Sequence, residues 1–154
     1  LNRMLIATKS SKIDLSSENN TEELAKKISK KLKPKDIIYL YGEMGVGKTT
    51  FVRYLINEFQ KKNKLQITEV TSPTFNLLYE YDINQIKINH YDLFRLKTKE
   101  EIINLDLFND ISNTITFIEW PQIIDKKPDN LIELDFKYEE NHQKRSVQIK
   151  GLIL

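Results

Sequence analysis

The chain contains no cysteine, which excludes disulfide bonds and thiolate metal sites. It has no apolar run near the roughly 20 residues that a membrane-spanning helix needs, and no signal-peptide pattern, so we expect no membrane partner. Arginine is scarce as well: there are four, at positions 3, 53, 95 and 145, and the formal net charge is only +2. These values are low for a dedicated nucleic-acid-binding protein.

Glycine is equally scarce, and its distribution is the most informative feature of the sequence. Three of the four glycines lie in one stretch, which reads Gly42-Glu43-Met44-Gly45-Val46-Gly47-Lys48-Thr49. This stretch matches G-x-x-x-x-G-K-[ST], the pattern of the phosphate-binding P-loop. An apolar run over 37–41 precedes it and a helical pattern follows it, which is the context that the pattern requires. The sequence therefore predicts a binding site for a nucleoside triphosphate.

The residues of this loop have distinct chemical roles. Glycine permits positive φ without a clashing Cβ, so the backbone N–H groups around Gly45, Val46 and Gly47 can turn toward phosphates. Lys48 is expected to reach the β- and γ-phosphates, and the hydroxyl of Thr49 to coordinate Mg²⁺.

Thr50 follows as a second threonine. It either supports the α-phosphate or continues the first helical turn.

The length of 154 residues and the 40% hydrophobic content fit a single domain spanning residues 1–154. The expected helices are 20–33, with a capping box at Asn20 and Glu23 and an end before Pro34, then 49–62, and 98–107 with a second capping box. The expected strands are 3–8, 37–41, 67–70, 76–81, 86–91, 114–118, 131–136 and 146–149. This order predicts a small α/β P-loop NTPase domain. Its central, mostly parallel sheet is flanked by helices and carries an attached antiparallel hairpin over 76–91.

Two carboxylates follow strand-like runs and are candidates for the acid that a P-loop NTPase needs. Glu119 comes directly after the apolar run 115–118, and Asp92 comes after 86–91. Either one could hold Mg²⁺ or orient the attacking water, and either could also be a surface acid at a strand end.

Three further features are open to more than one interpretation. His90 suits a proton donor, a phosphate contact or a structural residue beside the sheet. Trp120 is the only tryptophan and follows a candidate acid, yet it also suits a core or rim aromatic. Residues 72–74 fit a loop that senses the γ-phosphate, and also an ordinary proline turn.

Two common P-loop classes are disfavoured. The nearest match to the guanine-reading N-K-x-D pattern, residues 63–66, lacks the final aspartate. A metabolite kinase usually carries several arginines in a mobile lid, and the scattered arginines offer no such lid. A small-molecule kinase and a nucleotide-gated binding module nevertheless remain alternatives to an ATPase.

Four blocks occur in an order and spacing that resembles the TsaE family, over about 6–149. They are residues 41–50, residues 72–75 (Ser-Pro-Thr-Phe), residues 90–95 (His-Tyr-Asp-Leu-Phe-Arg) and residues 119–121 (Glu-Trp-Pro). TsaE is the bacterial ATPase of tRNA threonylcarbamoyladenosine biosynthesis. Departures from the usual pattern, such as Phe94 in place of a frequent tyrosine, affect no charged position.

The resemblance implies an accessory protein that binds and slowly hydrolyses ATP with Mg²⁺ and acts on the TsaB–TsaD heterodimer. That pair modifies adenosine 37 of tRNAs reading codons that begin with A. It further implies that Thr49 and Glu119 hold the metal, that Asp92 assists hydrolysis, and that Glu18 lies by the adenine. With Lys48, Asp92 and Glu119 as the catalytic residues, the activity would be a Mg²⁺-dependent ATPase stimulated by partners.

The expected tRNA contact is indirect, through that complex, because the net charge is near neutral. Lysine runs at 26–27 and 30–31 are expected on a solvated helix face. A cytoplasmic location follows from the absence of cysteine and from the need for a nucleoside triphosphate.

Overall fold

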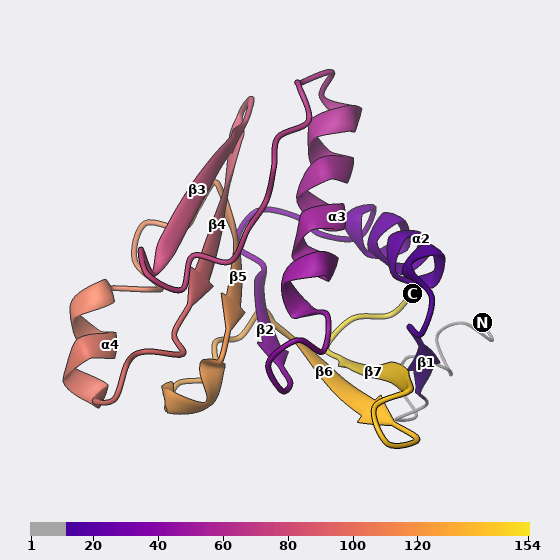
Figure 1. Cartoon of the computed structure of the whole chain (residues 1–154). Coiled ribbons are helices and arrows are strands. Elements are labelled where there is room, and N and C mark those ends of the chain that lie inside the picture. Colours follow the sequence, from indigo (N-terminus) through magenta and orange to yellow (C-terminus); the bar gives the residue numbers. More distant parts are fainter. Residues whose placement is uncertain (1–11) are drawn as a thin grey trace.

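The structure is a computed structural model and describes residues 12–154 (Figure 1). The strand expected over 3–8 lies outside the described residues. The strands are β1 (Ile13–Asp14), β2 (Ile37–Tyr41), β3 (Leu78–Ile83), β4 (Ile86–Asp92), β5 (Thr114–Glu119), β6 (Leu131–Glu139) and β7 (Lys144–Lys150). The helices are α2 (Glu18–Ser29), α3 (Lys48–Lys62) and α4 (Lys99–Leu105), with a 3₁₀ turn η1 (Pro121–Ile123). Within 12–154, none of these helices has both the length and the apolar composition needed to cross a bilayer.

All seven strands form one mixed sheet in the order β1-β7-β6-β2-β5-β4-β3. The centre is parallel, since β2 pairs in parallel with β5 and β6, and β4 pairs in parallel with β5. The expected α/β class with a parallel centre is confirmed. Antiparallel strands extend the sheet at both ends, however: β3 beside β4 on one side, and β7 with β1 beside β6 on the other. The hairpin expected over 76–91 forms the first extension, and the two strands expected over 131–136 and 146–149 pair in the second.

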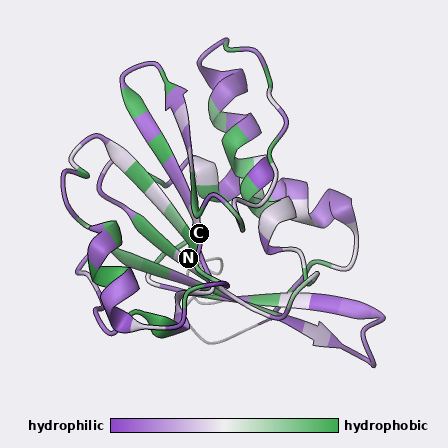
Figure 2. Ribbon diagram, turned by 60° about the vertical axis from the view of Figure 1, so that its left-hand side comes forward, coloured by the Kyte–Doolittle hydropathy of each residue, from purple (hydrophilic) through white to green (hydrophobic). Residues whose placement is uncertain are grey.

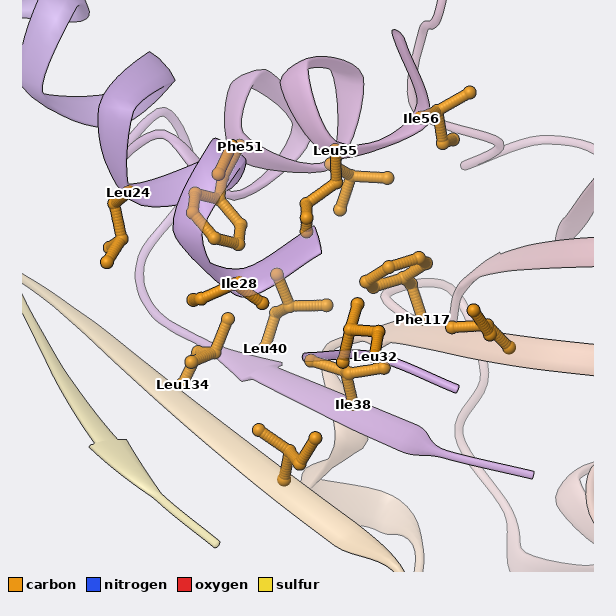
Figure 3. Close-up of a cluster of buried hydrophobic side chains, with 14 of the residues drawn as sticks. Leu24, Ile28, Leu32, Ile38, Leu40, Phe51, Leu55, Ile56, Phe117 and Leu134 are labelled. Carbon is orange, nitrogen blue, oxygen red and sulfur yellow. The ribbon is translucent and has the colours of Figure 1, made fainter. Parts of the chain in front are cut away.

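Helices cover both faces of this sheet, and each face has its own apolar cluster. Along β2, Ile38 and Leu40 pack under α2 and α3, whereas Ile37 and Tyr39 face the side of α4. This alternation follows from the two-residue period of a strand. Figure 3 shows the larger cluster, in which side chains of the two helices meet those of the strands. Figure 2 shows hydrophobic segments on the strands and hydrophilic segments on the outer loops.

Helix α2 begins earlier than the sequence pattern indicated. Its N-cap is Ser17, whose hydroxyl accepts a hydrogen bond from the Asn20 N–H at 3.1 Å. The Asn20 side chain instead donates to the carbonyl of Asp14. The predicted capping box at Asn20 and Glu23 was therefore wrong, because a serine hydroxyl one turn earlier already caps the free N–H groups. The helix also ends at Ser29, ahead of the predicted end.

The strand expected over 67–70 is also wrong, because residues 65–73 form neither strand nor helix. The polar groups of this segment bind α3: the Thr68 N–H donates to Gln60 Oε1, and Asn57 donates to the Thr68 carbonyl. Side-chain amides therefore satisfy backbone groups that a neighbouring strand would otherwise satisfy. The segment crosses from the end of α3 to the edge strand β3.

The other elements agree with the sequence pattern apart from their ends. The capping box of α4 is confirmed, with Thr98 as N-cap and Glu101 bound to its backbone N–H. The two C-terminal strands are longer than expected and reach Glu139 and Lys150.

Because β2 and β4 both pair in parallel with β5, the carboxyl ends of these three strands meet at one edge of the sheet, and Asp92 is the register partner of Glu119. Polar side chains predicted from separate segments therefore converge there.

Candidate functional site

The glycine-rich loop joins β2 to α3 at this edge. Gly42 has φ +146°, and a Cβ there would lie 2.8 Å from Val46 Cγ1 and 2.9 Å from the Phe136 carbonyl oxygen. Gly47 is the N-cap of α3 with φ +116°, and no side chain caps the helix. The first N–H groups of α3 are thus free of side-chain partners and, with the helix dipole, favour an anion.

Lys48 is the first residue of α3, and its side chain folds back over the loop. It is 4% exposed, donates a hydrogen bond to the Gly42 carbonyl, and holds Nζ 3.7 Å from the centre of the Trp120 ring. Burial lowers the pKa of Lys48, and the charges of Glu119 and Asp92 oppose that shift. The ammonium group of Lys48 is therefore held at the loop by an aromatic face and one carbonyl.

Glu119, at the end of β5, lies directly beside the start of α3. The Thr49 hydroxyl lies 2.9 and 3.1 Å from the two carboxylate oxygens, and His90 Nε2 lies 2.6 Å from Oε2. Glu119 and His90 are both buried. Because a carboxylate only accepts, both neighbours must donate to it.

Asp92, at the end of β4, binds the loop over 72–75. Its Oδ2 accepts from the hydroxyls of Ser72 and Thr74, and its Oδ1 accepts from the Phe94 N–H at 2.9 Å. Arg95 donates to the carbonyl of Thr74 from the other side. Asp92 therefore anchors this loop beside the P-loop.

These groups surround a pocket of about 250 Å³ at the carboxyl edge of the sheet. The sequence-predicted residues that line it are Gly45, Gly47, Lys48, Thr49, Thr50, Asp92 and Glu119. Ser72, Thr74, Phe94 and Trp120 complete much of the wall. Residues predicted from four separate blocks of the sequence thus come together around one pocket.

Three predicted positions lie outside this wall. Val46 is buried beneath the loop. Glu18 lies at the start of α2 with a side chain 64% exposed, and its carboxylate binds Arg53 of α3 at 2.9 Å. His90 lies behind Glu119 in the sheet, so the structure offers no free path from its ring to a phosphate in the pocket.

Arg145 lines the pocket, although sequence reasoning gave it no role. It comes from β7, and its backbone is held by the two residues that follow β1: Ser16 Oγ accepts from its N–H, and the Leu15 N–H donates to its carbonyl. Its guanidinium lies near the ring of Tyr138. The only available signal was the rarity of arginine, because its place depends on pairing between the two ends of the chain.

The donor set suits a phosphate ester with a hard divalent cation. It combines free N–H groups, one lysine, a threonine hydroxyl and two carboxylates. Within residues 12–154, no group of three or more His, Cys, Asp or Glu side chains could hold a metal ion. A cation at Thr49 and Glu119 would therefore need ligands from phosphate and water as well.

Comparison with known proteins agrees with this geometry. The family described as "Threonylcarbamoyl adenosine biosynthesis protein TsaE" matches residues 15–147. The tRNA threonylcarbamoyladenosine biosynthesis protein TsaE of Rickettsia typhi is 41% identical over 137 residues, which are 88% of this chain and 92% of that protein. The Rickettsia conorii protein of the same name is 44% identical over 110 residues, which are 71% of this chain, and the chain spans only 61% of its length.

The crystal structure of Bacillus subtilis YdiB superposes with a TM-score of 0.66 at 22% identity, covering 88% of this chain and 81% of that chain. This likeness supports the fold, while the family match over 15–147 covers the loop and both acidic strand ends. The chain belongs to the TsaE family of threonylcarbamoyl adenosine biosynthesis proteins.

Proposed function

We propose that this protein binds ATP with Mg²⁺ and hydrolyses it slowly. As an accessory protein, it would support threonylcarbamoyl modification of adenosine 37 in tRNAs that read codons beginning with A. The observation that carries the proposal is the convergence of Lys48, Thr49, Asp92 and Glu119 on one pocket beside an uncapped helix N-terminus. Membership of the TsaE family supplies the link to tRNA.

The P-loop would bind the triphosphate through backbone N–H groups of Gly45, Val46 and Gly47, with Thr50 at the α-phosphate. Lys48 would exchange its contacts with Trp120 and the Gly42 carbonyl for the β- and γ-phosphates. A lysine suits this movement because its charge lies at the end of a flexible stem.

The side chains also fit Mg²⁺. The Thr49 hydroxyl donates a hydrogen bond to Glu119, so the lone pairs of Thr49 Oγ1 remain free for a cation. Bound Mg²⁺ would neutralise charge that develops on the phosphates during hydrolysis. Glu119 would hold the metal directly or through its water, fixed in place by Thr49 and His90.

Asp92 would assist hydrolysis by holding the loop over 72–75 against the phosphate end of the pocket. Two hydroxyls and one N–H already bind its carboxylate. Positioning is thus a better-supported role for Asp92 than proton abstraction. Glu18 would lie by the adenine, where it also fixes Arg53 of α3.

The partner we propose is the TsaB–TsaD heterodimer, with tRNA reached mainly through that complex in the cytoplasm. Carbamoyl transfer would belong to the partner enzyme, and ATP turnover here would reset the complex. Among the described residues the pocket is lined by two carboxylates, one lysine and one arginine, which fits this division because a metabolite kinase usually carries several arginines in a mobile lid.

Calorimetric titration with a non-hydrolysable ATP analogue and Mg²⁺ tests the nucleotide site. We expect the wild type to bind, Lys48→Ala to lose tight binding, and Lys97→Ala, an exposed lysine outside the pocket, to bind as the wild type does. Equal affinity of Lys48→Ala and the wild type would contradict the proposal. A phosphorylated metabolite that appears in step with ADP would instead establish a kinase.

A further inference from the structure

Helices α2 and α3 are in contact at their C-terminal ends, and because α3 begins at the P-loop, this contact lies at the end of α3 away from the pocket. A side-chain hydrogen bond joins them, in which Lys62 Nζ donates to Ser29 Oγ at 3.0 Å. The chain then leaves α2 through residues 30–35 and leaves α3 through residues 63–65. Two lysine-rich segments that are far apart in the sequence therefore share one end of the molecule (Figure 1).

We define the lysine surface as six exposed lysines at this end. They are Lys30, Lys31, Lys33, Lys35, Lys62 and Lys64. Within residues 12–154, none of the six forms an ion pair. Residues 1–11 contain no Asp or Glu that could supply one.

Carboxylates of α2, α3 and the segment after α2 have other contacts. Asp36 is buried and accepts the Lys33 N–H, and Glu58 pairs with Lys61 at 3.7 Å. Farther back on α2, Glu23 pairs with Lys26 at 3.8 Å. Six exposed lysines without an ion pair within residues 12–154 thus gather at one end of a chain whose formal net charge is only +2.

Helix stability alone does not account for this charge. A cation near a helix C-terminus is favourable by roughly 0.3–1 kcal/mol, but the effect falls off within the last turn. Lys33, Lys35 and Lys64 lie beyond the helices. Salt or an external polyanion would relieve the repulsion among these lysines.

We propose that the lysine surface binds the phosphate backbone of tRNA directly. Lysines without interleaved aromatic side chains suit sequence-independent contact with phosphates. Between Lys30 and Lys35 the one large apolar side chain, Leu32, is buried, so it is not available to insert into a lipid surface. The choice of tRNA as the polyanion rests on the proposed function.

This surface is separate from the nucleotide pocket. Helix α3 has 15 residues, and at about 1.5 Å per residue its ends are about 22 Å apart. The P-loop lies at one end and the lysine surface at the other, so tRNA and nucleotide can bind together.

The test is equilibrium binding of an unmodified tRNA transcript to the full chain over a series of salt concentrations. The variant is Lys30→Ala/Lys31→Ala/Lys64→Ala, and the matched control is Lys97→Ala/Lys99→Ala/Lys126→Ala, with the same change of charge near α4. We expect salt-dependent binding by the wild type and the control. We expect weaker binding by the variant, with the slope of log K against log salt reduced by about two to three.

Two further measurements keep the result specific. ATP with Mg²⁺ should not displace the tRNA, and Lys48→Ala should bind tRNA as the wild type does. A loss of ATP binding without a loss of tRNA binding would therefore concern the nucleotide site alone. Equal loss in both triple variants, no binding by the wild type, or tighter binding to vesicles containing phosphatidylserine than to tRNA would overturn the inference. Unchanged ATP affinity in the variant shows that it is folded.

Discussion

His90 and Glu119 are joined by a hydrogen bond of 2.6 Å between Nε2 and Oε2, and His90 is 0% exposed. Because the carboxylate can only accept, Nε2 must carry the hydrogen. His90 Nδ1 has no hydrogen-bond partner within residues 12–154. The ring therefore makes its one polar contact with the carboxylate, and we interpret His90 as a positioning residue for Glu119.

Replacing His90 should affect turnover more than nucleotide affinity. His90→Phe keeps an aromatic ring but removes the donor, so Glu119 would lose its orientation. Turnover should fall about 10- to 100-fold, the usual loss when a hydrogen-bond partner that orients a metal ligand is removed. His90→Gln offers an amide donor and should recover part of the rate. Steady-state turnover and calorimetric ATP affinity check this; equal rates in the two variants would contradict it.

Glu119 itself should separate turnover from binding. Glu119→Ala removes the carboxylate that accepts from Thr49 and His90, so we expect Mg²⁺-dependent turnover to fall far more than the affinity for ATP. The measurement is turnover across a Mg²⁺ titration, beside nucleotide binding. Unchanged turnover would exclude the role that we give to Glu119.

Trp120 should report on the movement of Lys48. It is the only tryptophan, and Lys48 Nζ lies over its ring. If Lys48 leaves the ring to reach phosphate, saturation with ATP and Mg²⁺ should change the tryptophan emission. Constant emission at nucleotide concentrations that calorimetry shows to be saturating would mean that the contact persists in the bound state.

The hydrogen bonds of Asp92 should limit local opening of the loop over 72–75. Ser72→Ala removes one of the two hydroxyls bound to Asp92, and Asp92→Ala removes the acceptor for both. We expect faster amide hydrogen exchange in residues 71–77, with Asp92→Ala the larger effect. Exchange unchanged in Asp92→Ala would show that Arg95 and the backbone hold the loop without it.

Two glycines of the P-loop should differ in their effect on stability. A Cβ at Gly42 would meet the Phe136 carbonyl at 2.9 Å, whereas at Gly47 the nearest atom is Arg145 Nη1 at 3.9 Å. Both have positive φ, so each alanine variant carries strain of about 1–3 kcal/mol, and Gly42→Ala carries a clash in addition. Denaturant unfolding should therefore show the greater loss of free energy of unfolding in Gly42→Ala.

Local patterns were predictable from the sequence, and long-range placements were not. The P-loop and the capping box at Thr98 are set by residues within a few positions of one another. The 67–70 segment has strand-like composition, but Gln60 on α3 satisfies its backbone. Sequence spacing cannot show such a tertiary contact.

The same reason explains two features that the sequence did not reveal. Arg145 reaches the pocket because β1 pairs with β7, which joins the two ends of the described chain. The lysine surface forms because α2 and α3 end together. Each depends on pairing between segments that lie far apart in the sequence.

The most direct test of the account is ATP turnover by the purified protein, measured alone and then with the TsaB–TsaD heterodimer and tRNA. We predict low turnover by the protein alone and a clear rise with the partners, which Lys48→Ala and Glu119→Ala should both abolish. Turnover that is indifferent to the heterodimer and tRNA would contradict the proposed accessory role.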